Sequence, residues 1–167
     1  VLLTADSLAG VLPTIRSRCV SFAIAPVSPA DCARYCTAHG VDKKTAALYS
    51  ELFDGHIGTV LTAARDKART EQVDKAMELA RAAQAGDSYT AAVLLAPYEK
   101  DKAGAAALLR DLRAVAAAGL QGSPHAPVQG QQAQRTLRLA EAAIQRLGAQ
   151  VNPKIVLTVF AARLAHA

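Results

Sequence analysis

Two arginines and a thiol lie close together near the start of the chain, in the string LPTIRSRC over residues 12–19. A guanidinium carries its donors in a planar fork, so Arg16 or Arg18 could pair with two oxygens of one phosphoryl group at once. Most arginines are instead ordinary surface or salt-bridge residues. Residue type alone leaves both interpretations open.

The three cysteines, Cys19, Cys32 and Cys36, do not have the spacing of a metal site. Their number is odd and no secretion signal precedes them, so we expect reduced thiols rather than a disulfide framework. Cys32 and Cys36 would share one helix face, but no third and fourth ligand follows at the spacing of a zinc site. The pattern therefore predicts buried structural cysteines and no bound metal.

Other patterns that carry chemistry are missing from the sequence. No G-x-x-x-x-G-K-[ST] string occurs, so the chain cannot cradle a triphosphate by that route. There is also no Ser/His/Asp or Cys/His arrangement and no paired-carboxylate site. The sequence contains no recognisable catalytic site of its own.

Composition favours helices. Of the 167 residues 51% are hydrophobic and only 4% aromatic, and the apolar residues are mainly Ala and Leu, which lose little side-chain freedom in a helix. An all-β fold is thereby almost excluded. No apolar run reaches the ~18 residues that span a bilayer, and the first residues, VLLTADS, lack a charged leader. We expect a cytoplasmic protein with no membrane partner.

The net charge of +5 is unevenly distributed. Residues 1–85 carry ten basic and nine acidic side chains, whereas residues 86–167 carry nine and five. A basic second half fits contact with nucleic acid, and a solvated basic surface explains it equally well.

Residues 1–25 contain two short apolar runs, VLLT and VSFAIA, which read as buried strands of a parallel sheet. Such strands need neighbours, because two pieces alone would leave the edges of a sheet bare. Since the first residue is Val1 and not Met, we expect the chain to be a fragment.

From residue 28 onward the pattern is helical. Ser28 and Pro29 suit the start of a helix, Asp42 can cap the next one, and His56 begins a third. A break at Gly86-Asp87-Ser88 predicts a domain boundary. The expected helices cover about 28–39, 42–54, 56–64, 70–85, 89–95, 101–118, 131–147 and 153 to the C-terminus, with a mobile loop over 119–130.

The string LPTIRSRC resembles the Ser-Arg-Cys motif of the bacterial clamp-loader subunits, γ/τ and δ′ of DNA polymerase III, and of the related replication factor C proteins. In that family an apolar strand and a short helix precede the motif. Here Val1–Thr4 would be the strand, Asp6–Leu12 the helical stretch, and Pro13–Cys19 the motif.

The resemblance extends along the whole chain. APVSPADCARY at residues 25–35 is similar to the entry of the family's lid domain, and DGHIGTVL at 54–61 occupies the place of its second-sensor segment. GAQVNPKIVLTVFAARL at 148–164 is similar to the closing helix of the δ′ collar domain. The first and last segments are the most specific.

The family assigns an arginine-finger role to the middle residue of Ser-Arg-Cys, and the resemblance carries that role to Arg18, acting in trans. Pro13, Thr14, Ser17 and Cys19 would support the motif. ATP would be bound by neighbouring subunits, and the resemblance implies no cofactor and no metal in this chain.

The second-sensor segment departs from the ATP-hydrolysing members, which resemble Gly-Ser-x-Arg. This chain has Gly58 where the arginine would stand, and His56 reads as a helix-start residue. The departure points to the δ′ type, which does not hydrolyse ATP itself. A γ/τ-type ATPase subunit stays as an alternative, as does a helical adaptor or DNA-binding module unrelated to replication.

The resemblance implies a predominantly all-α chain in three parts: residues 1–25 as the end of an AAA+ α/β domain, 26–86 as a helical lid domain, and 87–167 as a helical collar and oligomerisation domain. Its expected function is to help load the sliding clamp on primed DNA during replication. The expected partners are the γ/τ and δ subunits, with the clamp and primed DNA reached through the complex. That function would place the chain in the DNA-directed DNA polymerase holoenzyme, which is a nucleotidyltransferase. The chain itself would contribute no catalytic site of its own.

Overall fold

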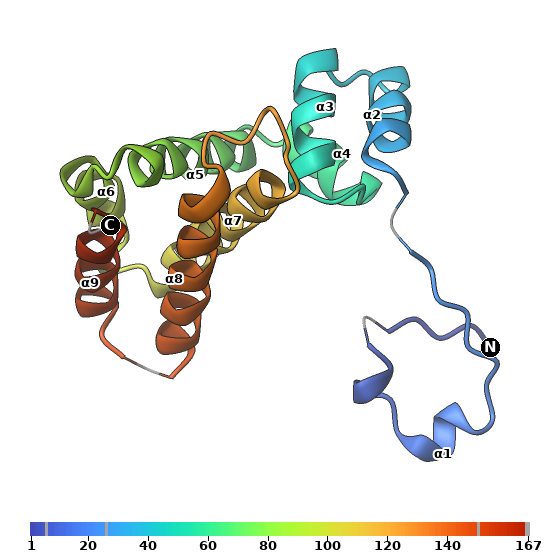
Figure 1. The fold of residues 1–167 in the computed structure, drawn as a ribbon. Helices are drawn as coiled ribbons and strands as arrows, with labels where there is room; N and C mark the ends of the chain where they lie inside the picture. The colour runs from blue at the N-terminus through green and yellow to red at the C-terminus, as the bar shows by residue number, and fades with distance from the viewer. Residues whose placement is uncertain (6, 26, 150, 166–167) are drawn as a thin grey trace.

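The computed structural model describes residues 1–5, 7–25, 27–149 and 151–165, and these residues are predominantly helical (Figure 1). The expectation of an all-α protein is confirmed at that level. Four predicted segments include positions outside the described residues, namely Asp6, Pro26, Gln150 and, in the helix predicted to reach the C-terminus, residues 166–167. The elements in chain order are η1 Leu8–Gly10, α1 Pro13–Arg16, α2 Pro29–Ala38, α3 Lys43–Leu52, α4 Ile57–Arg65, α5 Lys67–Ala85, α6 Ser88–Leu95, η2 Ala96–Tyr98, α7 Lys102–Leu120, α8 Gly130–Gly148 and α9 Pro153–Ala165.

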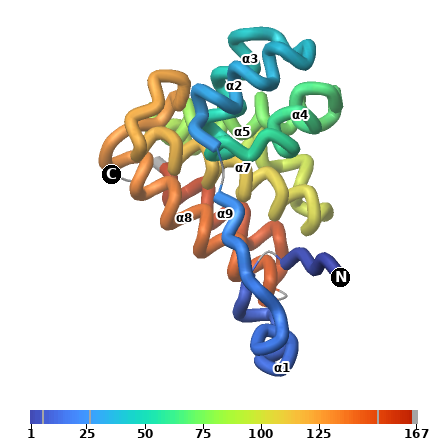
Figure 2. Tube along the Cα trace, turned by 90° about the vertical axis from the view of Figure 1, so that its right-hand side faces the viewer, coloured from blue at the N-terminus to red at the C-terminus, as the bar shows by residue number. Residues whose placement is uncertain are grey.

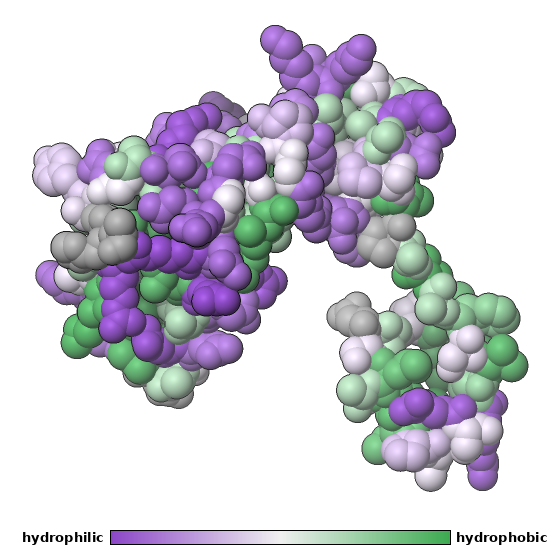
Figure 3. All heavy atoms as spheres, in the orientation of Figure 1, coloured by the Kyte–Doolittle hydropathy of each residue, from purple (hydrophilic) through white to green (hydrophobic). Residues whose placement is uncertain are grey.

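The prediction of two strands in residues 1–25 is wrong. Residues 1–4 and 20–25 form no strand, because a strand requires ladder hydrogen bonds to a neighbour and the described chain supplies none. The expected helical stretch before the motif is only the single 3₁₀ turn η1, which Ser7 caps. Leu2, Phe22 and Ile24 are 91%, 85% and 95% exposed. Figure 3 shows hydrophobic surface on a segment that stands apart from the helical body.

Helices α2, α3 and α4 form a compact three-helix unit, as predicted (Figure 1). The Ser28 hydroxyl oxygen accepts the Asp31 backbone N–H at 3.2 Å, and an Asp42 carboxylate oxygen accepts the Lys44 and Thr45 N–H groups at 3.0 and 3.1 Å. These bonds satisfy backbone donors that a helix start leaves unpaired. These caps explain why the predicted starts of α2 and α3 are correct.

The long helix α5 connects this unit to the rest of the body. Asp66 caps it at the Ala68 and Arg69 N–H groups, so α5 begins three residues before the predicted start near residue 70. It packs against both α4 and α7. At its end Gly86 has φ of +68°, and Asp87 caps α6. This break coincides with the predicted boundary, while the division into domains stays a prediction.

Helices α5 to α9 share one alanine- and leucine-rich core. α7 packs against α5 and α8, and α9 packs against α6 and α8, as the second view shows (Figure 2). The side chains at the centre are fully buried and come from every one of these helices: Leu79, Leu95, Leu108, Leu109, Leu112, Val115, Leu147 and Leu164. Small alanines between them let the helices approach closely, which accounts for a core with few aromatic residues.

The connection between α7 and α8 is more ordered than its loop-like composition predicted. Ala126 and Val128 are buried, and the Gln129 side-chain amide donates to the carbonyl oxygens of Ser123 and Ala126 at 2.8 and 2.9 Å. Gly119 lies so near the Val128 carbonyl that an added Cβ would meet its oxygen at 1.9 Å. The loop is thus tied down by its own hydrogen bonds and by close packing on α7.

None of the helices formed by the described residues is both long and apolar enough to cross a bilayer.

Candidate functional site

Arg18 lies in the turn after the short helix α1, two residues beyond its last residue Arg16, and local hydrogen bonds set its position. Pro13 occupies the first turn, where the missing N–H costs nothing. The Arg18 N–H donates to the Ile15 carbonyl at 3.0 Å, and the Ser17 hydroxyl donates to the Thr14 carbonyl at 3.1 Å. The turn that ends α1 is therefore closed by residues of the motif itself.

All of the motif residues are exposed to solvent, namely Pro13, Thr14, Ser17, Arg18 and Cys19. Among the described residues, no ion pair or side-chain hydrogen bond involves the Arg18 guanidinium. Arg16 is exposed too, in the last turn of α1. The arrangement leaves a fork of N–H donors available for a ligand that this chain does not provide.

The segment at residues 54–61 forms the end of the turn between α3 and α4 and the first five residues of α4. Asp54 and Gly55 both adopt positive φ, +47° and +72°, and His56 occupies the N-cap position of α4 without a side-chain capping bond. His56 therefore begins a helix, as predicted. Gly58 lies in the first turn of α4, where an added Cβ would meet no atom within 4 Å. Figure 1 shows α4 and α1 in separate parts of the molecule, so the structure does not bring this segment to Arg18.

Cys32 and Cys36 are completely buried on α2, as predicted, whereas Cys19 is exposed. Burial and the adjacent Cys32 thiol raise the pKa of Cys36, so the Cys36 thiol stays protonated near neutral pH. Within the part of the chain that the structure describes, no three His, Cys, Asp or Glu side chains gather as a metal-binding group.

One polar cluster that the sequence interpretation missed lies between α5 and α7. Asp111 is only 6% exposed and accepts hydrogen bonds from both Arg69 and Gln72, the latter at 2.6 Å. The Arg69 guanidinium also lies 5.6 Å from the centre of the Phe53 ring at the end of α3. Asp111 shares a helix face with Leu108, Leu112 and Val115, and a carboxylate on an apolar face was the signal that could have revealed it.

A second missed cluster joins α3 to the loop after α7. Glu51 accepts hydrogen bonds from the Ser123 hydroxyl and from His125 Nδ1, the latter at 2.9 Å. Residues on different elements meet here, 72 and 74 positions apart in the chain. No local pattern could have predicted such a pairing. Both clusters use their polar groups to hold helices together.

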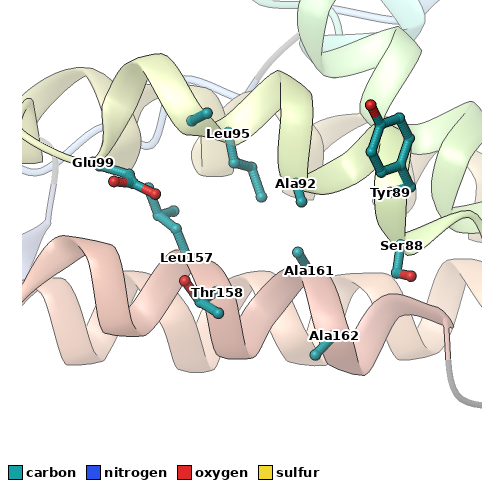
Figure 4. A pocket seen from close by; sticks show the side chains of 10 residues that line it. Ser88, Tyr89, Ala92, Leu95, Glu99, Leu157, Thr158, Ala161 and Ala162 are labelled. Carbon is teal, nitrogen blue, oxygen red and sulfur yellow. The ribbon is translucent and has the colours of Figure 1, made fainter.

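Two hollows in the surface of the described residues could hold a ligand by their size. The first, of 360 Å³, lies between α6 and α9, where Leu157 and Ala161 point toward Ala92 and Leu95 (Figure 4). The one carboxylate in its lining, Glu99, is paired with Lys154 at 3.3 Å. The second, of 490 Å³, lies beside the start of α2 and is bordered by Glu51 and Ser123, which bond to each other. Neither lining offers a nucleophile next to a base, so neither predicts catalysis.

No protein-family model, no curated protein and no solved structure matches the chain. The resemblance to clamp-loader subunits therefore stays a prediction from the sequence.

Proposed function

We propose that this chain is a δ′-like subunit of a bacterial DNA polymerase III clamp loader, which helps to load the sliding clamp on primed DNA. Arg18 would act in the ATP site of a neighbouring γ/τ subunit. The observation that carries the proposal is the exposed, unpaired guanidinium of Arg18 within the string LPTIRSRC. Local backbone bonds hold that residue at the end of α1.

The chemistry of phosphoryl transfer gives such an arginine its role. Negative charge builds on the oxygens around the γ-phosphate in the transition state, and a planar guanidinium can pair with two of them. When the arginine comes from another subunit, hydrolysis depends on assembly of the complex. Pro13, Thr14, Ser17 and Cys19 would keep the turn that presents Arg18, and Gly58 leaves the chain without a second-sensor arginine of its own.

The proposal also assigns the three parts of the chain. Residues 1–25 would complete an AAA+ domain. Their exposed apolar side chains support this, because apolar side chains of this number are usually buried against another protein surface. Residues 26–86 would form the lid and 87–167 the collar, which in the family joins the subunits into a ring. A clamp loader acts in the cytoplasm, and the proposal places the chain there.

The test reconstitutes the protein with γ/τ ATPase and δ subunits, the sliding clamp and primed DNA. Removing an arginine finger is expected to lower hydrolysis at the ATP site that it completes by about 10³-fold or more. We therefore expect Arg18→Ala to abolish DNA-stimulated hydrolysis at the neighbouring γ/τ site and the clamp loading that depends on it, while the complex still assembles in size-exclusion chromatography.

Two variants make the result specific. Arg16→Ala removes a charge two residues away and should leave most of the activity, whereas Arg18→Lys keeps the charge but loses the bidentate fork and should remain strongly impaired. Unchanged hydrolysis with Arg18→Ala overturns the finger assignment. Failure of the unaltered protein to join the γ/τ and δ subunits overturns the proposed function itself.

A further inference from the structure

The outer faces of α7 and α8 form a basic surface with a distinct composition. On α8 the exposed side chains at helical spacing are Gln131, Gln134, Arg138, Gln145 and Arg146, with Arg135 half-buried beside them. Residues three, four, seven and eight apart share a helix face, so these side chains form one stripe. The stripe carries arginines and amides and a single flanking carboxylate, Glu141.

The carboxylate of Glu141 is already neutralised. Arg113 of α7 donates to it at 3.0 Å, and this ion pair brings the exposed side of α7 next to the stripe. Arg110 lies three residues before Arg113 and therefore on the same side of α7. The other acid of α7, Asp111, is buried and bound to Arg69, so it does not reduce the charge of this face. We call Arg110, Arg113, Arg135, Arg138 and Arg146, together with the glutamines of α8, the basic face.

Three arginines of the basic face have no acidic partner among the described residues. No ion pair there involves Arg110, Arg138 or Arg146. Arg135 donates to the carbonyl oxygen of Arg163 at 2.7 Å, which brings the last turn of α9 and its own arginine to the edge of the face. Hydrophilic side chains dominate the side of the body that is turned toward the viewer in Figure 3.

The basic face lacks the exposed apolar and aromatic side chains that would bind a protein partner or a single-stranded nucleic acid. No large hydrophobic side chain is exposed on α8 or on α7 before Leu120, and residues 99–149 contain no aromatic residue. Aromatic and apolar anchors carry most of the affinity in protein–protein interfaces, and aromatic platforms bind the bases of single strands. Arginine and glutamine, by contrast, bind phosphates and the base edges of a duplex.

We propose that the basic face binds the backbone of double-stranded DNA through Arg110, Arg138 and Arg146. Arg138 and Arg146 are eight residues apart, about 12 Å along the helix, which is close to the width of the major groove of B-form DNA. That groove admits an α-helix, whereas the major groove of an RNA duplex is too narrow for side chains to enter. The inference does not depend on the clamp-loader function, since the face belongs to this chain alone.

The test measures binding of the unassembled full chain to a fluorescein-labelled 20-base-pair DNA duplex by anisotropy between 50 and 200 mM KCl. Each phosphate contact contributes about 0.9 to the slope of log affinity against log salt. The variant Arg110→Gln/Arg138→Gln/Arg146→Gln should lower that slope by about 2.7. Over this salt range the affinity of the unaltered chain should therefore fall roughly 40-fold more than that of the variant.

A matched variant tests whether binding depends on the basic face or only on the net charge of the chain. Lys43→Gln/Lys44→Gln/Lys67→Gln removes three exposed charges outside α7 and α8 and should leave the slope unchanged. In the opposite direction, Glu141→Gln releases Arg113 and should tighten binding, while Glu78→Gln, an equal change of charge on α5, should not. Helical circular dichroism checks that each variant is folded.

Equal losses from the two triple variants would overturn the proposal, as would tighter binding to single-stranded DNA or to an RNA duplex of the same length. Absence of binding at 50 mM KCl would overturn it as well. Arg18→Ala should not affect this assay, so loss of the DNA surface and loss of the arginine finger are distinguishable.

Discussion

The segment before α2 and the helical body differ in what holds their residues in place. In the body, side chains from distant helices meet in one core, and Leu108, Leu112 and Leu147 are completely or almost completely buried. In residues 1–25 no described side chain is buried, and the only bonds are those of η1, α1 and their turns. The motif around Arg18 therefore keeps a local shape without the packing that would fix its place.

The largest expected difference between the two regions is in thiol reactivity. Cys19 is exposed, whereas Cys32 and Cys36 are buried on α2 and burial raises the pKa of Cys36. Buried thiols react only when the structure opens, which for a core position costs much of the global stability of several kcal/mol. N-ethylmaleimide at pH 7.5 should label Cys19 at least ~10³-fold faster than the other two, as followed by mass spectrometry.

In the Cys19→Ser variant the fast phase should vanish, and in denaturant all remaining cysteines should react together. If Cys32 is labelled as fast as Cys19 in the native protein, the contrast between the two regions is wrong for α2.

The second contrast is in the cost of removing an apolar side chain. Leu112→Ala leaves a cavity in the core and should lower the free energy of unfolding by about 2–5 kcal/mol. Phe22→Ala removes a larger side chain, but one that contacts solvent, and should change it by less than about 0.5 kcal/mol. Urea denaturation followed by circular dichroism measures both. A loss above 1 kcal/mol for Phe22→Ala would mean that the segment packs on the body.

The same contrast explains which predictions from the sequence succeeded. The starts of α2 and α3 were predicted within a residue or two because Ser28 and Asp42 mark them through bonds to nearby backbone groups. Each of these signals lies within three residues of the group that it binds. Such signals can therefore be recognised from a few neighbouring residues of the sequence.

The predictions of strands at VLLT and VSFAIA were wrong because strand formation depends on residues that are not nearby in the sequence. An apolar run becomes a strand only when another strand accepts its backbone hydrogen bonds, and no sequence pattern says whether that partner is present. The bonds of Glu51 to Ser123 and His125 were out of reach as well, because they join residues far apart in the chain. For the candidate site, its exposed position could not be predicted, and its role still rests on the resemblance.

The third contrast lies at the junction of the two regions, where Val27 meets Gly55. Gly55 has φ of +72°, and an added Cβ would meet the Val27 carbonyl oxygen at 1.8 Å. Gly55→Ala should therefore lower the free energy of unfolding by about 1–2 kcal/mol for the left-handed conformation alone, and by more if Val27 cannot move. Thermal and urea unfolding would measure the loss.

Gly58→Ala provides the matched control three residues later. Its site is open and helical, so alanine should stabilise the protein slightly, by up to about 1 kcal/mol. If the two alanine variants unfold alike, Val27 does not pack on the turn before α4, and the junction is looser than the structure implies.

The smallest expected effect is a change of stability at acidic pH. It distinguishes helices that a carboxylate caps from α1, which Leu12 precedes without a side-chain cap. The Thr90 hydroxyl and the Thr90 N–H both donate to Asp87 and hold its pKa below the ordinary 3.8. A carboxyl whose pKa is lowered by folding stabilises the protein above its ordinary pKa, and this contribution is lost as the pH falls through the folded value. In Asp87→Asn the side chain can still cap the helix but cannot titrate. The unfolding midpoint of this variant should therefore depend less on pH below about 4. Between pH 6 and 8 the midpoints of the variant and of the unaltered protein should differ by a constant amount. If the stability advantage of the unaltered protein over Asp87→Asn instead shrank as the pH rose through the acidic range, it would have the wrong sign for this bond, and the cap of α6 would then stabilise the body no more than the uncapped start of α1 stabilises the Arg18 turn.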